Sequence, residues 1–284
     1  MNQNICRNCG YKFLKPMLTF KNYPIPLWPT EKKLKNNKST LKVYECKSCS
    51  LIQLQRFRNK DVIKFYEPEQ FIIEDKNLLM DRISLIKKKI PLINFKNKKI
   101  LEIGGGRNNI LSYLPKSEKW INDVSIIDKK LNGIKVIKSS YENFKIKKNY
   151  FDYIFFFHTL EHIENPKKFL NKIFGLLKKS GKIILEVPNI SYYAKKNPYH
   201  AFYFQHLLLF DYNSLNNLLT SCNFEIYKKH SVNEKIILLS YKKNQSGINS
   251  KKYIKKKTYL SSIINNFFKN LKKNKKILIN LKKV

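Results

Sequence analysis

Two pairs of cysteines near the N-terminus have the spacing of a metal site. Cys6 and Cys9 form one Cys-x-x-Cys pair, and Cys46 and Cys49 form the second. Two such knuckles can complete a tetrahedral zinc site whose four thiolates leave no open position for chemistry. Disulfides are the alternative, but they are uncommon in the cytoplasm, where we expect this protein. The spacing therefore predicts structural zinc, with the fifth cysteine, Cys222, far away in the sequence.

A glycine-rich segment could bind an anionic ligand. Residues 98–106 read Lys-Lys-Ile-Leu-Glu-Ile-Gly-Gly-Gly, which predicts a buried strand, a tight turn and a helix that opens near Ile110. Glycines let the backbone approach a ligand, and a helix N-terminus offers N–H groups to an anion. Asn109 stands where a dinucleotide fingerprint would have its third glycine. A glycine-rich turn alone is a weak signal, so its meaning depends on the motifs later in the chain.

Histidines are the candidate bases. His158 and His162 are four residues apart, and His200 and His206 belong to an aromatic segment at residues 199–211. The first pair could suggest a metal site, but no Glu stands at the metalloprotease position and the sequence shows no third ligand. We therefore interpret His162 as a hydrogen-bonded loop residue. A positioned His can remove a proton from a substrate, and His206 is the first choice, ahead of His158 and His200.

Apolar strands that alternate with amphipathic helices predict an α/β domain with a mainly parallel sheet. The expected strands lie at residues 98–103, 124–128, 134–137, 150–157, within 180–189, at 224–228 and at 235–241, the last two as an antiparallel hairpin. The expected helices lie at residues 77–90, after Pro166 with Asn165 as cap, and after Asp211 as cap. Asp128 would end the second strand, where a carboxylate can accept the hydroxyls of a ribose.

Three motifs together resemble class I S-adenosylmethionine (SAM) methyltransferases. They are Glu102-x-Gly104-x-Gly106, the His-Thr-Leu-Glu-His-Ile-Glu-Asn-Pro run at residues 158–166, and the Val-Pro-Asn that closes residues 181–189. Their order and spacing match that family. The resemblance implies a Rossmann-like fold with a seven-stranded, mostly parallel sheet, helices on both faces, and SAM as cofactor.

The same resemblance assigns residues to the cofactor. The glycines Gly104, Gly105 and Gly106 would cradle the methionyl end, Glu102 would order its ammonium group, and Asp128 would hold the ribose. Three further residues are expected at the cofactor, namely Ser139, Phe157 and His158. The acid that often meets the adenine in this family is missing after the third strand.

The second knuckle, residues 46–54, resembles the zinc-binding domain that precedes the catalytic domain in certain sugar methyltransferases. That resemblance implies a sugar acceptor, linked to a nucleotide or part of a surface or lipid-linked glycan. The carbon-methylating members carry Glu-His where this chain has Gln205-His206. Without that acid we expect methylation of oxygen rather than carbon. An RNA or DNA methyltransferase and a non-catalytic binding protein with the same fold are the alternatives.

The net charge of +37 would suit a polyanionic partner, but only five of the 57 basic residues are Arg. Since Arg is the preferred reader of bases and phosphates, this composition argues against sequence-specific nucleic-acid binding. Compositional drift that leaves mostly solvated lysines is the alternative cause of the charge. We expect a small-molecule or glycan substrate, anionic in character, rather than nucleic acid. The sequence has no run of 18 apolar residues and no apolar signal segment, so we expect a cytoplasmic protein.

Composition divides the chain into four parts. We expect a zinc-binding module at residues 1–60, a linker and helix at 61–95, the SAM-binding domain at 96–243 and a Lys-rich tail at 244–284. Prolines within residues 16–29 predict an extended loop between the knuckles. Apolar residues at helical spacing over 260–271 predict a basic amphipathic helix that could contact the inner face of a membrane. A helix packed on the main domain and a disordered tail are the alternatives.

Overall fold

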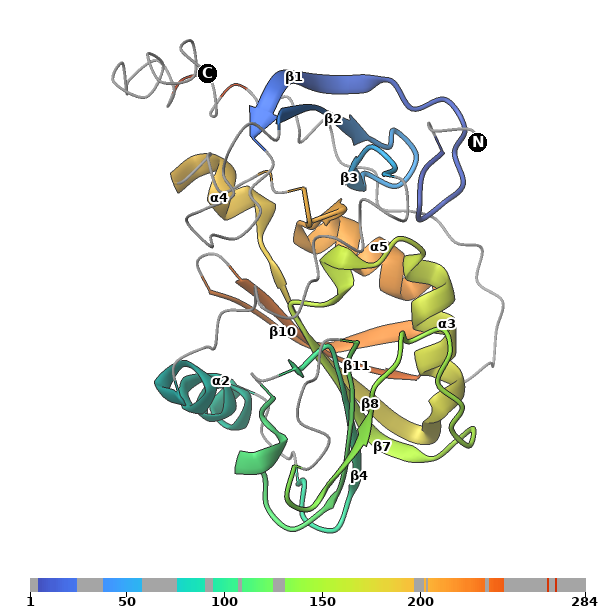
Figure 1. Ribbon diagram of the computed structural model, residues 1–284, viewed down its shortest axis with the longest axis vertical. Coiled ribbons are helices and arrows are strands. Elements are labelled where there is room, and N and C mark those ends of the chain that lie inside the picture. Colours follow the sequence, from blue (N-terminus) through green and yellow to red (C-terminus); the bar gives the residue numbers. More distant parts are fainter. Residues whose placement is uncertain are drawn as a thin grey trace.

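A computed structural model (Figure 1) describes residues 5–24, 38–57, 76–89, 94–106, 109–124, 131–196, 202, 204–232, 235–242, 265 and 269. The described chain forms two sheets. The larger has seven strands in the order β10-β11-β8-β7-β4-β5-β6, and the smaller has four in the order β1-β2-β3-β9. The predicted tail lies outside the described residues, apart from Asn265 and Lys269.

The seven-stranded sheet is mostly parallel, as predicted. Its strands are β4 (Lys99–Ile103), β5 (Glu118–Asn122), β6 (Ile134–Ile137), β7 (Phe151–Phe157), β8 (Leu177–Pro188), β10 (Phe224–Val232) and β11 (Lys235–Lys242). Strands β6, β5, β4, β7 and β8 run parallel, and β11 joins β8 to β10 by antiparallel pairing. This is the seven-stranded, mostly parallel sheet that the resemblance implied, with the expected terminal hairpin.

Helices cover both faces of this sheet. Figure 1 shows α2 (Lys76–Lys89) on one side and α3 (Pro166–Leu176) on the other. Side chains alternate along a strand, so Phe155 of β7 packs in the cluster that contains α2, whereas Phe156 packs in the cluster that contains α3. Apolar side chains at helical spacing line the inner face of α3 and are almost fully buried; they are Phe169, Leu170, Ile173 and Leu176. Each contributes about 1.5–3 kcal/mol by burial.

Two helix starts were predicted from capping residues. In α5 (Tyr212–Ser221), Asp211 accepts a hydrogen bond from the Ser214 N–H at 2.8 Å, and the Ser214 hydroxyl accepts one from the Asp211 N–H. This reciprocal pair confirms the predicted cap. At α3, Pro166 occupies the first turn as predicted, and Asn165 occupies the cap position. The cap position is the predicted one, although the Asn165 side chain makes no capping hydrogen bond.

The second strand was placed wrongly. It is β5 (Glu118–Asn122), whose Trp120 pairs with Leu101 of β4, and not residues 124–128. Val124, at the start of the apolar run that suggested the strand, is 51% exposed in a bend. The strand Glu-Lys-Trp-Ile-Asn lacks a continuous apolar pattern, because it lies near the sheet edge and only its last two residues are fully buried. Asp128 lies outside the described residues.

The helix expected after the glycines is also absent from the described residues 109–124. Their one helical element is a short 3-10 turn, Leu111–Tyr113. Pro115 ends it, because a proline forces the preceding residue, Leu114, into the extended conformation seen here, with φ −85° and ψ 153°. Residues 107–108, directly after the glycines, lie outside the described residues.

The four-stranded sheet joins distant parts of the chain. It comprises β1 (Pro16–Pro24), β2 (Lys38–Glu45), β3 (Ile52–Leu54) and β9 (Leu208–Leu209), all antiparallel. Part of the expected extended loop is thus the strand β1, and residues 25–37 lie outside the described chain. The predicted boundary at residue 60 separates β1–β3 from their partner β9, which comes from the aromatic segment of the main domain.

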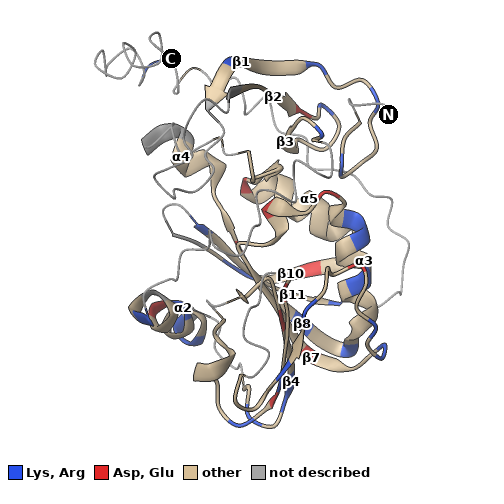
Figure 2. Cartoon of the chain, in the orientation of Figure 1, with Lys and Arg blue, Asp and Glu red and all other residues tan. Residues whose placement is uncertain are grey.

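Basic residues are spread over the fold. Figure 2 shows Lys and Arg on α2, on α3 and at ends of the strands. Several are paired locally; Lys178 contacts Asp152 at 2.9 Å, and Lys168 contacts Glu142 at 2.9 Å. The helices on both faces of the large sheet therefore carry part of the positive charge.

Candidate active site

A pocket of about 230 Å³ lies at the carboxyl ends of four parallel strands. Gly104 follows β4, Asp123 follows β5, Ser139 follows β6 and His158 follows β7, and all four line it. Strands β4 and β7 are neighbours although β5 and β6 lie between them in sequence. The winding of the chain reverses there, and open α/β sheets bind ligands at such a switch point. The sequence motifs had placed Gly104, Ser139 and His158 at this edge.

The glycine turn needs glycine at Gly104 for two reasons. Its φ is +75°, and an added Cβ would lie 2.3 Å from Oγ1 of Thr159. That hydroxyl is itself fixed, because it lies 3.0 Å from the carbonyl oxygens of Ile103 and Phe157. At Gly105 a Cβ would lie 2.8 Å from the carboxylate of Glu102. The side chains of Thr159 and Glu102 thus pack tightly against the turn, and Gly104 lines the pocket.

Glu102 lies beneath this turn rather than in the pocket lining. The residue is 1% exposed, and Oε2 accepts a hydrogen bond from the Ile110 N–H at 3.0 Å. It therefore fixes the turn against the segment after it. The expected contact of Glu102 with the cofactor ammonium stays a prediction, as does cradling by Gly105 and by Gly106, whose φ is +46°.

Asp123 holds the place that was predicted for Asp128. It directly follows β5, is 9% exposed and lines the pocket. Its neighbour Asn122 donates to the carbonyl oxygens of Ile137 and Ser139, at 3.0 and 2.8 Å, which ties the end of β5 to the end of β6. The Asn-Asp pair after Trp-Ile was the available signal, and it was missed because the strand was placed too late.

His158 stands at the tip of β7 with φ +47°, a backbone region that non-glycine residues seldom occupy. Its Nε2 lies 2.8 Å from Oε1 of Glu186, and its Nδ1 lies 3.3 Å from Oε1 of Glu161. Burial lowers the pKa of His158, but the hydrogen bonds and charges of the two carboxylates outweigh it and raise the pKa to about 9. Both ring nitrogens therefore face carboxylates.

Glu186 connects the pocket to α2. Arg82 of α2 contacts its carboxylate through Nε at 3.2 Å and Nη2 at 3.0 Å, and Lys235 lies 3.3 Å away. Burial raises the pKa of Glu186, but His158 and Arg82 hold it well below its usual range. The Arg82 guanidinium also lies 5.2 Å from the ring centre of Phe157. Phe157, expected at the cofactor, thus faces α2 and is not part of the pocket lining.

A second histidine cluster adjoins the pocket. Glu161, His162 and His206 each offer a ligand atom, and these atoms all lie within 4.8 Å of one another. His162 lines the pocket, and its Nδ1 lies 2.8 Å from the carbonyl oxygen of Gln205. Burial, assisted by His162, lowers the pKa of His206 to about 3. The loop role expected for His162 is seen, but its closeness to His206 was not foreseen. His200 lies outside the described residues.

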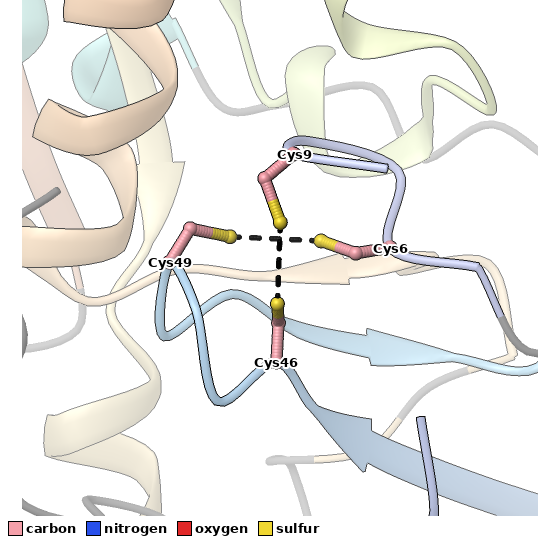
Figure 3. Close-up of side chains that lie close together, drawn as sticks. All are labelled: Cys6, Cys9, Cys46 and Cys49. Carbon is pink, nitrogen blue, oxygen red and sulfur yellow. Dashed lines mark hydrogen bonds between the residues drawn. The ribbon is translucent and has the colours of Figure 1, made fainter. Parts of the chain in front are cut away.

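The four paired cysteines converge beside the small sheet, from the loop before β1 and the turn between β2 and β3 (Figure 3). Their Sγ atoms all lie within 4.8 Å of one another, with 3.5 Å between Cys6 and Cys49 and 3.4 Å between Cys9 and Cys46. Thiolates bound to one zinc at about 2.3 Å lie roughly 3.8 Å apart, so the cluster fits that ion. Hydrogen bonds within the cluster lower the pKa of Cys9 and Cys46 and raise the pKa of Cys6 and Cys49, and zinc binding requires all four thiols to lose their protons.

The two knuckles have the same backbone geometry. Gly10 donates its N–H to the carbonyl of Cys6 at 3.0 Å, and Ser50 donates to Cys46 at 2.8 Å. Both donors have positive φ, +77° and +60°. Each Cys-x-x-Cys pair is therefore closed by a left-handed residue that turns both thiols to one side.

Arg7, between the first two cysteines, clamps this module to the active-site loop. Its Nη1 donates to the carbonyl of Leu54 at 2.6 Å, and its Nη2 pairs with Glu164 at 2.9 Å. Arg56 pairs with the same carboxylate. Glu164 lies directly after the loop that holds Glu161 and His162, so the position of that loop depends on the small sheet.

Comparisons with known proteins agree with this geometry. The family model described as "Methyltransferase domain" matches residues 74–229, more than half of the chain. No curated protein matches the sequence. Among the described residues, no helix combines the length and apolar character needed to cross a membrane.

Solved methyltransferase structures are among those similar to this chain. A Burkholderia thailandensis 1,6-didemethyltoxoflavin-N1-methyltransferase with bound 1,6-didemethyltoxoflavin and S-adenosylhomocysteine is 12% identical, with a TM-score of 0.50 over 72% of this chain and 96% of that one. A SAM-dependent methyltransferase of Thermotoga maritima is 18% identical, with a TM-score of 0.46 over 58% and 89% of the two chains. One of Mesorhizobium loti is 10% identical, with a TM-score of 0.42 over 52% and 93%.

Proposed function

We propose that this chain, which belongs to the methyltransferase-domain family and is a SAM-dependent methyltransferase, methylates a hydroxyl group of a sugar. The sugar would be linked to a nucleotide or form part of a surface or lipid-linked glycan. One observation carries the proposal: a cysteine-knuckle module is clamped by Arg7 to the loop that lines the pocket. That arrangement resembles the sugar methyltransferases that carry a zinc-binding domain. A net charge of +37 suits an anionic acceptor.

The pocket residues suit SAM. When bound, the cofactor supplies a methyl group made electrophilic by a sulfonium. The Gly104 backbone is free of side-chain bulk where the methionyl part would lie, and Asp123 is placed to accept ribose hydroxyls. Ser139, at the end of β6, would lie towards the adenine. The ribose-binding role expected for Asp128 rests on the resemblance alone, because Asp128 lies outside the described residues.

The proton of the acceptor hydroxyl needs a base. His158 is a poor candidate because its two ring nitrogens face Glu186 and Glu161. We assign it a positioning role at the pocket wall. His206, beside His162 at a ring-centre distance of 5.0 Å, is our first choice, and His200 is the second. A neutral imidazole suffices for a hydroxyl during methyl transfer, whereas a carbon acceptor needs a stronger base.

The proposal includes one structural zinc ion on Cys6, Cys9, Cys46 and Cys49. Three of these residues are buried, and four thiolates close the coordination sphere. The ion would therefore stabilise the small sheet and take no part in methyl transfer.

The test is a methyl-transfer screen with labelled SAM. The acceptors are nucleotide-linked deoxysugars, lipid-linked glycans and RNA, and SAM binding is measured separately by calorimetry. We expect transfer to at least one sugar acceptor and none to RNA. Transfer to RNA alone would overturn the sugar assignment, and a lack of SAM binding would overturn the assignment of the pocket.

A further inference from the structure

We propose that Glu161, His162 and His206 bind a divalent transition-metal ion, at a site separate from the four cysteines. The three residues come from two segments, a 3-10 turn at Leu160–His162 and the aromatic segment before β9. Their ligand atoms lie within 4.8 Å of one another, and Nε2 of His162 is 3.9 Å from Oε1 of Glu161. Ligands that share one ion at about 2.1 Å lie roughly 3.0–3.4 Å apart, so small side-chain rotations would complete the site.

The hydrogen bond of His162 prepares it as a ligand. Its Nδ1 lies 2.8 Å from the carbonyl oxygen of Gln205. A carbonyl can only accept, so Nδ1 carries a proton, and Nε2, on the side of Glu161, is the nitrogen left to bind an ion. Metal-bound histidines are commonly fixed in this way by a second hydrogen bond to a backbone carbonyl.

Glu161 supplies the charge. It is 1% exposed, and neither carboxylate oxygen has a hydrogen-bond partner of good geometry in the described part of the chain. Its cationic neighbour is His158, whose Nδ1 lies 3.3 Å from Oε1 and whose Nε2 pairs with Glu186, so one imidazolium charge is shared between two carboxylates. Burial of an incompletely paired carboxylate is costly, and a bound cation would offset that cost.

The ligand set indicates the class of ion. Two imidazoles and one carboxylate favour Zn²⁺, Fe²⁺, Co²⁺ or Ni²⁺ over Mg²⁺ and Ca²⁺, which prefer oxygen ligands. Three protein ligands also leave positions for water or substrate. Since His162 lines the pocket, an ion here would lie at its wall and could acidify a coordinated hydroxyl. The acidification of a substrate hydroxyl, in which His206 is a metal ligand and not the base, rests on the proposed function. Binding of the ion does not rest on it.

The test uses Co²⁺ as the probe and the full-length protein with zinc already on the four cysteines. Calorimetry measures affinity, and visible absorption reports the ligand type, because thiolate ligands add charge-transfer bands that imidazole and carboxylate do not. We expect one equivalent of Co²⁺ to bind without thiolate bands. Glu161→Gln and His206→Ala should each weaken binding at least about tenfold. His230→Ala, on β10 and outside the cluster, is the matched control and should bind as the wild type does.

Two results would overturn the site: no uptake of Co²⁺ or Zn²⁺ beyond the four-cysteine ion, or wild-type affinity in both variants. Circular dichroism checks each fold; if Glu161→Gln does not fold, the His206→Ala affinity decides. Neither measurement needs SAM or an acceptor. A protein that binds Co²⁺ but no SAM would therefore contradict the proposed function and leave the metal site intact.

Discussion

At the scale of single residues, Gly104 is the most constrained position of the pocket. An alanine there would place its Cβ against Thr159 and adopt a positive φ. We expect Gly104→Ala to weaken SAM binding at least about tenfold and to lower the melting temperature. Gly175→Ala is the control, because its Cβ in α3 meets nothing within 4 Å. It should leave SAM affinity unchanged and add about 0.5–1 kcal/mol of stability. Calorimetry with equal SAM affinity in both variants would refute the cradle.

Asp123 and Asp128 can be compared directly. If the acid after β5 accepts the ribose hydroxyls, Asp123→Ala should cost about 1–3 kcal/mol of SAM binding free energy. Asp128→Ala should then bind SAM normally. Titration calorimetry on both variants decides, and the reverse pattern would restore the assignment drawn from the sequence.

His206 and His158 should behave differently. His206→Ala should lower methyl-transfer turnover at least about tenfold while SAM affinity stays nearly intact, since a positioned His typically contributes roughly 10²–10⁴-fold. His158→Ala should also loosen the Arg82–Glu186 contact region and lower thermal stability. A His206→Ala enzyme with wild-type rate, beside an inactive but folded His158→Ala enzyme, would show that the base stands at the tip of β7.

At the scale of elements, the sequence predicted those strands and helices whose apolar pattern is uninterrupted. β7 and β11 begin and end within one or two residues of expectation, and α5 begins directly after its predicted cap, because each buries a stripe of large side chains. β5 was not predicted, because its polar residues are held in the sheet by tertiary contacts and do not form an apolar pattern in the sequence. The meeting of Glu161 with His206 was not predicted either, because no spacing rule links two segments 45 positions apart in the chain.

One of these tertiary contacts gives a pH prediction. Glu118 of β5 accepts hydrogen bonds from Tyr150, Lys135 and Trp120 at 2.7, 2.9 and 3.0 Å. Burial raises the pKa of its carboxyl, but these bonds outweigh it and lower the pKa to about 2, from an ordinary value of 4.5. A carboxyl with a lowered folded-state pKa stabilises the fold above its unfolded value and loses that effect as pH falls through the folded value.

We therefore expect Glu118→Gln to lower the free energy of unfolding near pH 7 by about 0.5–1 kcal/mol, a small amount because solvent screens this partly exposed group. The difference from wild type should shrink between pH 4.5 and about 2. Urea unfolding at several pH values measures it. Asp81→Asn on the exposed side of α2 is the charge-matched control. A difference that stays constant with pH would contradict the ionic explanation.

At the scale of the whole molecule, the cysteine module and the catalytic domain depend on each other. Helix α5 holds both knuckles, through Asn217 to the carbonyl of Cys49 at 3.1 Å and Ser221 to Asn8 at 3.1 Å. Arg7 extends this contact to Glu164. Changes at the cysteines should therefore reach the active-site loop.

Cys46→Ser tests that dependence. We expect the variant to lose one tightly held zinc ion per chain, to melt at a lower temperature and to transfer methyl groups more slowly, because the loop at Glu161 and His162 loses support. Elemental analysis, calorimetric melting and the methyl-transfer assay measure the three effects. Cys222→Ser, at the cysteine outside the cluster, should retain the zinc. Unchanged zinc content in Cys46→Ser would refute the four-cysteine site.

The pairing of β3 with β9 also sets a sequence of events during synthesis. Both knuckles and β1–β3 leave the ribosome early, whereas Leu208 comes after Leu54 by roughly 150 residues. At about 5–20 residues per second the edge of β3 waits on the order of 10–30 s for its partner. The four-stranded sheet is thus completed long after β3 is made, and the open edge of β3 needs protection from other nascent chains until then.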